Sequence, residues 1–113
     1  MKIIKDSIKL AELRDMAKNM FGDFVKAVMD VEREIMAVDA ELHADLEALL
    51  LEWGSKQENL WGINLYPKLS GEDFVEFDSM INIKPRQENR SRNVENQGVR
   101  DKIISIVNKL VTK

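Results

Sequence analysis

The stretch "VKAVMDVEREIMAVDAELHADLEALLLEW", residues 25–53, decides the fold, because two different periods fit it. With the helical period, its apolar residues form nearly one stripe in a segment rich in good helix formers. That stripe begins at Phe24, directly before the stretch, and continues with Val28, Val31, Ile35, Val38, Leu42, Leu46, Leu49 and Trp53. Propensity alone favours the helix. With a period of two, which the residues also fit, the stretch gives two strands joined by a short connection at Asp39 and Ala40. The apolar faces of these strands are Ala27, Met29, Val31, Ile35 and Ala37, broken by Arg33, and Ala44, Leu46, Ala48 and Leu50.

The two ends of the chain are easier to assign, and both are predicted to be helical. In "SIKLAELRDMAKNMFG", residues 7–22, apolar residues follow at helical spacing and Gly22 is a suitable C-terminal cap. In "NQGVRDKIISIVNKLV", residues 96–111, Asn96 is a suitable N-cap and Lys109 lies near the negative end of the helix dipole. The apolar positions of this second helix are Val99, Ile103, Ile106 and Leu110.

Two later segments predict strands, because both combine aromatic with β-branched residues and end at a proline. They are "NLWGINLYP", residues 59–67, and "DFVEFDSMINIKP", residues 73–85, with turn material in between. The second alternates apolar with polar residues, so that one face would be core and the other wet or functional. Its apolar positions are Val75, Phe77, Ile81 and Ile83, and its polar positions are Glu76, Asp78, Asn82 and Lys84.

The strings "ELHAD", "LWGINLYP", "FDSMINI" and "NRSR" are distinctive. With them, essentially the whole chain resembles a family of short, uncharacterised prokaryotic proteins classed only as a domain of unknown function. Members of that family often carry Gly-Gly where this chain has Asp39 and Ala40, which implies a hairpin turn and therefore strands in residues 25–53. Asp and Ala tolerate positive φ less well than Gly, so the turn is less clearly marked here. The resemblance implies no activity, substrate or catalytic residue.

The composition indicates one domain, residues 1–113, in the size range where a single core is usual. A formal net charge of -3 is unlike the strongly basic balance of a dedicated nucleic-acid binder. The absence of cysteine excludes disulfides and thiolate chemistry and fits a cytoplasmic location. No apolar run is long enough for a membrane span, so we expect no membrane association.

These assignments predict an α+β fold. An antiparallel sheet of about four strands would be packed on one face by the N- and C-terminal helices. The other face would stay polar.

A metal site is one candidate on that polar face. In a strand, His43 shares a side with Asp45 and Glu47, and Asp78 can join them from the strand at residues 73–85. Carboxylates with one imidazole suit Mg²⁺ or Mn²⁺ better than structural Zn²⁺. The alternative is a solvated sheet face that carries charges without a ligand.

A second candidate is an anion site in the segment after Pro85. Only Val94 is aliphatic between residues 85 and 98, which predicts a long surface loop. The guanidinium groups of Arg86, Arg90 and Arg92 suit phosphate or carboxylate. The alternative is that these arginines pair with acidic residues of the sheet or the loop.

Polar residues of the sheet complete the predicted ligand site. Trp61 and Tyr66 fall on opposite faces of one strand, so Trp61 is assigned to the core and Tyr66 joins Asn64 on the polar face. Asn82 would reach that face from the next strand. An aromatic ring there could cover a ligand or stack on a base, unless another element of the fold covers it.

We therefore predict a non-enzymatic binding or regulatory module for an anionic partner, a small ligand or RNA. The alternatives are a small metal-dependent hydrolase using His43, Asp45 and Asp78, and a protein-protein assembly module. Neither Ser55 nor Ser79 lies in a nucleophile elbow. The five glycines form neither a dinucleotide fingerprint nor a P-loop, and no cofactor is predicted.

Overall fold

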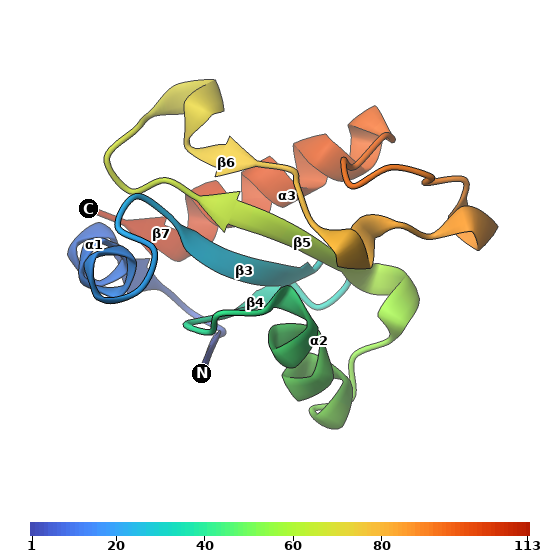
Figure 1. Cartoon of the computed structure of the whole chain (residues 1–113), viewed down its shortest axis with the longest axis horizontal. Coiled ribbons are helices and arrows are strands. Elements are labelled where there is room, and N and C mark those ends of the chain that lie inside the picture. The colour runs from blue at the N-terminus through green and yellow to red at the C-terminus, as the bar shows by residue number, and fades with distance from the viewer.

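The computed structural model describes all residues, 1–113, and has an antiparallel sheet of five strands with three helices (Figure 1). The strands, in their order across the sheet, are β1 (Lys2–Ile4), β4 (Ile35–Val38), β3 (Val25–Asp30), β5 (Leu60–Leu65) and β6 (Val75–Glu76). The helices are α1 (Leu10–Asn19), α2 (His43–Glu52) and α3 (Gln97–Leu110). A short parallel pair, β2 (Ile8–Lys9) with β7 (Val111–Thr112), joins the two ends of the chain. The α+β prediction is confirmed.

The terminal helices α1 and α3 both pack on one face of the sheet, as predicted, and enclose the main core of 17 buried residues. Both predicted caps are present. Gly22 has φ 90° and its N–H donates to the carbonyl of Ala17 at 2.6 Å, which ends α1. The Asn96 side chain accepts from Val99 N–H at 3.0 Å, which begins α3.

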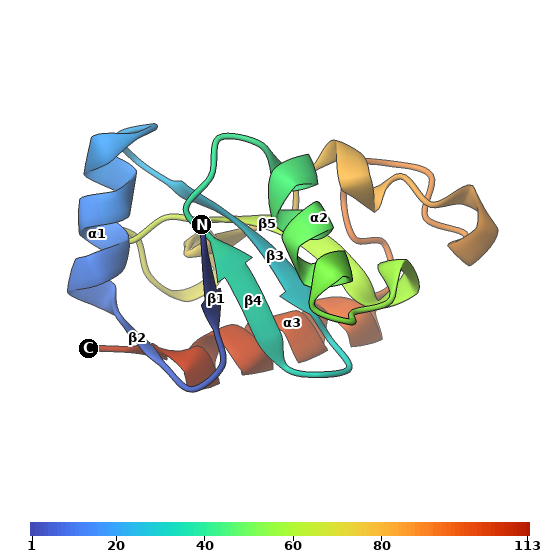
Figure 2. The same ribbon diagram turned by 90° about the horizontal axis from the view of Figure 1, so that it is seen from below.

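The second face of the sheet is not left polar, because α2 covers much of it (Figure 2). Leu46 and Leu50, one helical turn apart, pack against Val28 of β3 and Leu60 of β5. The predicted strand at residues 44–50 is therefore wrong, and the helical preference of those residues was the better guide. Only residues 25–30 and 35–38 of the ambiguous stretch form strands.

The hairpin turn also lies elsewhere than expected, between β3 and β4 at residues 31–34. Buried Asp30 holds it, since Oδ1 accepts from the N–H groups of Glu32 and Arg33, each at 3.0 Å, and Oδ2 accepts from Ser55 Oγ at 2.6 Å. The connection at Asp39 leads instead into α2. Asp39 nevertheless has φ 73°, a conformation that favours glycine.

The predicted strand at residues 73–85 is mostly wrong, because only β6 pairs with the sheet and residues 80–82 form a single 3-10 turn. The side chain of Asn82 makes hydrogen bonds to β5 that a further strand would otherwise make. Its Oδ1 accepts from Gly62 N–H at 2.7 Å and its Nδ2 donates to the Gly62 carbonyl at 2.9 Å. These are the two groups that a neighbouring strand would otherwise satisfy.

Candidate functional site

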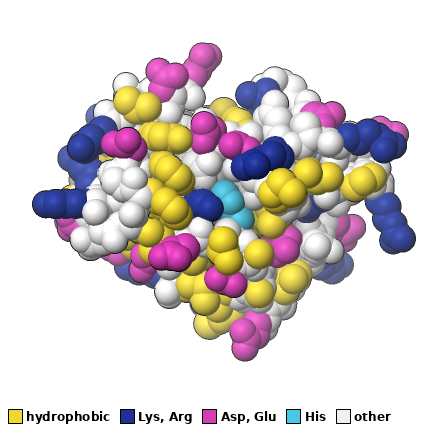
Figure 3. All heavy atoms as spheres, viewed as in Figure 1, with side chains coloured by type: hydrophobic (Ala, Val, Ile, Leu, Met, Phe, Trp, Pro, Cys, Tyr) yellow, Lys and Arg dark blue, Asp and Glu magenta, His cyan; other side chains and the backbone are white.

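A small pocket lies at the end of the second sheet face that α2 leaves uncovered. It has a volume of about 180 Å³. It brings together β3, the start of α2, the 3-10 turn at residues 80–82 and the loop that carries Arg92. We call it the His43 pocket, and its lining residues are Lys26, Leu42, His43, Ala44, Ser79, Met80, Ile81 and Arg92. Figure 3 shows the histidine at the surface, with Lys or Arg side chains close by and hydrophobic side chains beside it.

His43 is the first residue of α2 and is largely buried. Its Nε2 lies 2.9 Å from the carbonyl oxygen of Ile63, so that Nε2–H donates to this carbonyl in the neutral ring. Burial lowers the pKa of His43, and the nearby charges of Lys26 and Arg92 lower it too, against the opposing effects of the Ile63 hydrogen bond and Asp78. The ring is therefore neutral at pH 7, and Nδ1 is free to accept or to take up a proton.

Two cationic side chains flank the imidazole. The ammonium group of Lys26 has no carboxylate partner and lies 5.1 Å from the centre of the Phe21 ring. Arg92 Nε pairs with Asp78 Oδ1 at 2.6 Å, and its side chain is 55% exposed. No side chain caps the first turn of α2, whose amide groups add positive potential at the same place.

Two carboxylates near the pocket, those of Glu76 and Asp78, are held by other groups. Glu76 Oε1 accepts from Asn64 Nδ2 at 2.8 Å and from the Tyr66 hydroxyl at 3.1 Å. Desolvation raises the pKa of Tyr66 above its usual value, as do the hydrogen bond to Glu76 and nearby carboxylates. Buried Asn64 is the cross-strand neighbour of Lys26, and its Oδ1 has no hydrogen-bond partner. Lys26 therefore remains the one unpaired charge of the pocket.

The predicted metal ligands do not come together. His43 and Asp45 lie two residues apart on α2, so they point to different sides of the helix, and Asp45 is exposed. Asp78 is paired with Arg92. No group of three or more His, Cys, Asp or Glu side chains could hold a metal ion. The metal prediction thus loses its geometric basis, because it assumed that residues 43–47 form a strand.

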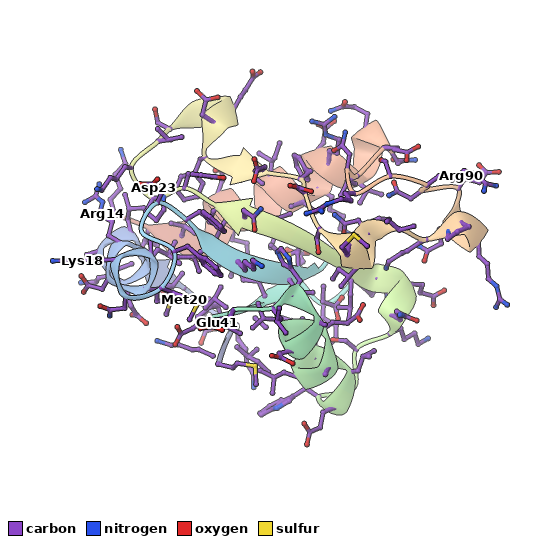
Figure 4. The ribbon with its side chains drawn as sticks, in the orientation of Figure 1. Arg14, Lys18, Met20, Asp23, Glu41 and Arg90 are labelled. Carbon is purple, nitrogen blue, oxygen red and sulfur yellow. The ribbon has the colours of Figure 1, made fainter.

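Of the three predicted arginines, only Arg92 lines the His43 pocket. Figure 4 shows Arg90 at the outer end of the loop, away from the sheet. Arg86 lines a separate hollow of about 610 Å³. The loop itself is ordered by buried Asn89, whose Nδ2 donates to the carbonyls of residues 82, 91 and 93.

The predicted polar ligands have different roles. Asn82 is fully buried, and both Oδ1 and Nδ2 of its side chain are hydrogen-bonded to backbone groups of the protein. It is therefore a structural residue. Tyr66 lies at the edge of the site, where its ring packs against Phe24 with 5.5 Å between the ring centres. Trp61 is in the main core, as predicted.

Lys84, which the sequence places beside the basic loop, is buried instead. Its ammonium group donates to the carbonyls of Gln57 and Leu60 and lies 4.5 Å from the centre of the Trp61 ring. Burial lowers the pKa of Lys84 from 10.5 to about 8, against the opposing charges of Glu47 and Glu58. Lys84 therefore supports the fold and is not available to a ligand.

This pKa predicts a pH-dependent stability. Between pH 8 and pH 10.5 the unfolded chain holds the Lys84 proton more tightly than the folded protein, so raising the pH favours folding. The free energy of unfolding of the unmodified protein should rise by about 2 kcal/mol from pH 8 to pH 10, relative to that of Lys84→Met. Urea denaturation of both proteins across this range measures the difference. A constant difference would show that Lys84 keeps an ordinary pKa in the folded protein.

Sequence reasoning did not select three of the pocket-lining residues as ligand-binding residues. Pairing of the two strands predicted in residues 25–53 would put Lys26 on the same polar face as His43, but Lys26 was not among the predicted ligand-binding residues. Leu42 and Met80 gave no signal, because each looks like an ordinary core residue in the sequence. In the structure, Leu42 is 56% exposed and Met80 is 64% exposed.

Comparison with known proteins places the chain in a family without assigning an activity. No curated protein and no solved structure matches it. None of its helices combines the length and the apolar composition that crossing a bilayer requires. A family model described as protein of unknown function (DUF5674) matches residues 2–110, and the chain therefore belongs to this family.

Proposed function

We propose that this protein binds a small anionic ligand in the His43 pocket and is not an enzyme. The observation that carries the proposal is the convergence of Lys26, His43 and Arg92 on one pocket at the uncapped start of α2. The unpaired ammonium and the amide groups of the helix end both favour a negative charge. The guanidinium of Arg92 can still donate from its terminal nitrogens, because Asp78 engages only Nε.

The size of the pocket favours a small ligand over RNA. A volume of about 180 Å³ corresponds to about six water molecules. RNA binding would call for a row of cations along a surface. Arg86 and Arg90 lie away from this pocket and do not extend it into such a row.

Sulfate is a suitable probe, because its charge does not change between pH 5.5 and 7.5. We expect sulfate to shift the amide resonances of residues 26, 43, 44 and 92 in a saturable way. Lys26→Met and Arg92→Gln should each weaken binding by about tenfold, the effect of one charge-assisted hydrogen bond. Arg86→Gln and Arg90→Gln are matched controls that remove the same charge elsewhere and should bind normally. Equal losses in all four variants would show only non-specific attraction and would contradict the proposal.

Binding should also strengthen as the pH falls. His43 is neutral at pH 7, and a bound anion would favour its protonation, since Nδ1–H would then be a further donor. Sulfate should therefore bind more tightly at pH 5.5 than at pH 7.5, and His43→Gln should remove this dependence. Binding to a metal site would have the opposite pH dependence and weaken as the pH falls, because protons compete with a metal ion for the imidazole.

A further inference from the structure

The His43 pocket has an apolar side as well as a cationic one. Of its eight lining residues, four are hydrophobic. Two of these, Leu42 and Met80, are 56% and 64% exposed, and they contribute the apolar surface at the mouth of the pocket. Large apolar side chains gathered beside a cavity commonly mark a binding site.

Leu42 occupies a position where apolar residues are disfavoured. It is the N-cap of α2, where Ser, Thr, Asp or Asn would accept a hydrogen bond from the first turn of the helix. With leucine there, the helix end lacks a side-chain cap and an apolar surface lies directly beside it. A ligand with a negative group and an apolar group would satisfy both features at once.

The charges near the pocket favour one negative charge over two. Lys26 is unpaired, whereas Asp78 partly neutralises Arg92. His43 adds no charge at pH 7. A dianion such as sulfate or a phosphate monoester would therefore keep part of its charge unneutralised and bind less tightly than a matched monoanion.

We infer that the ligand is a monocarboxylate with a compact aliphatic group, such as a branched-chain acid. This inference rests on the proposed function and specifies the ligand of the same pocket. The carboxylate would face Lys26, Arg92 and the first turn of α2. The aliphatic group would contact Leu42, Met80 and Ile81, and the pocket volume of about six waters accommodates both parts.

The experiment compares acetate with isovalerate at pH 7, using the amide resonances of residues 26, 43 and 92. Isovalerate has three more carbon atoms, and partial burial of these should make it bind about tenfold more tightly than acetate. Leu42→Gln and Met80→Gln should each remove much of this tenfold advantage, measured within each variant as the ratio of the isovalerate and acetate affinities. Leu51→Gln is the matched control, because Leu51 is 41% exposed on the same helix but does not line the pocket.

The outcomes separate this inference from the proposed function. If isovalerate binds no better than acetate while both depend on Lys26 and Arg92, the inference is overturned and the anion site stands. If isovalerate is preferred but Leu51→Gln abolishes the preference as strongly as Met80→Gln, the inference is also overturned. If neither carboxylate nor sulfate shifts the pocket resonances, both proposals fail.

Discussion

Replacing Gly62 by alanine is expected to lower the free energy of unfolding by about 3 kcal/mol. A Cβ atom at this position would lie 2.5 Å from both Cβ and Oγ of Ser79 and 3.1 Å from Cγ1 of Ile81. Ser79 cannot easily move away, because it is 1% exposed and its N–H donates to the Arg92 carbonyl at 3.1 Å. The strand and the turn would have to separate, and urea denaturation measures the loss.

A double variant distinguishes this clash from a general effect of alanine in β5. Ser79→Gly removes the two nearest of the three atoms that the new Cβ would meet, and leaves only Cγ1 of Ile81. Gly62→Ala should therefore be much less harmful in the Ser79→Gly background, and a double-mutant cycle should give a favourable coupling. Additive losses from the two substitutions would show that close approach to Ser79 does not determine the choice of glycine.

Asn82→Leu should be still more damaging, by about 4 kcal/mol, although the side chains are similar in size. The substitution leaves the N–H and the carbonyl of Gly62 without partners and also removes the bond from Nδ2 to the Arg92 carbonyl at 2.9 Å. All these groups lie in or beside a buried site, where an unsatisfied polar group is costly. Chemical denaturation measures the loss.

Asn93→Leu is a control for Asn82→Leu, because Asn93 is exposed and its Oδ1 accepts only from the adjacent Val94 N–H. We expect it to cost less than 1 kcal/mol, as is usual for surface positions, or about a quarter of the Asn82 effect. Similar losses in the two variants would mean that the side-chain bonds of Asn82 to β5 are not important for stability.

The parts of the fold that sequence predicted correctly are those with local signals. Gly22 and Asn96 mark helix ends through the conformation or hydrogen bond of a single residue. The strand at β5 follows from β-branched and aromatic residues between two turns. None of these assignments depends on what the segment packs against.

The assignment of residues 25–53 failed in part because neither period reveals tertiary contacts. Residues of β3 and β4 are buried on both faces, which removes the alternation that would mark them as half-exposed strands. The start of the turn had a usable signal in Asp30, followed by three charged residues among the next four. The resemblance placed the turn at Asp39 and Ala40, and the helix that follows was then misread as a strand.

The candidate site was harder to predict, because it depends on which polar groups the fold uses internally. Asn82 and Lys84 look like surface residues in the sequence, and only the backbone carbonyls around them explain their burial. In the sequence Arg92 looks like Arg86 and Arg90, and only its place beside the 3-10 turn at residues 80–82 brings it into the pocket. His43 was selected as a candidate and lines a pocket, but its neighbours there belong to segments that the sequence cannot bring together.

The late position of α3 in the chain has a consequence for biosynthesis. A ribosome completes every strand of the main sheet before it adds Ile103, Ile106 and Leu110, which close the core. Until then the nascent chain carries an apolar sheet face that only α1 can shield. Such a face invites association with other chains or with chaperones, so the interval between synthesis of the sheet and synthesis of α3 is the one in which this chain is most exposed to misassembly.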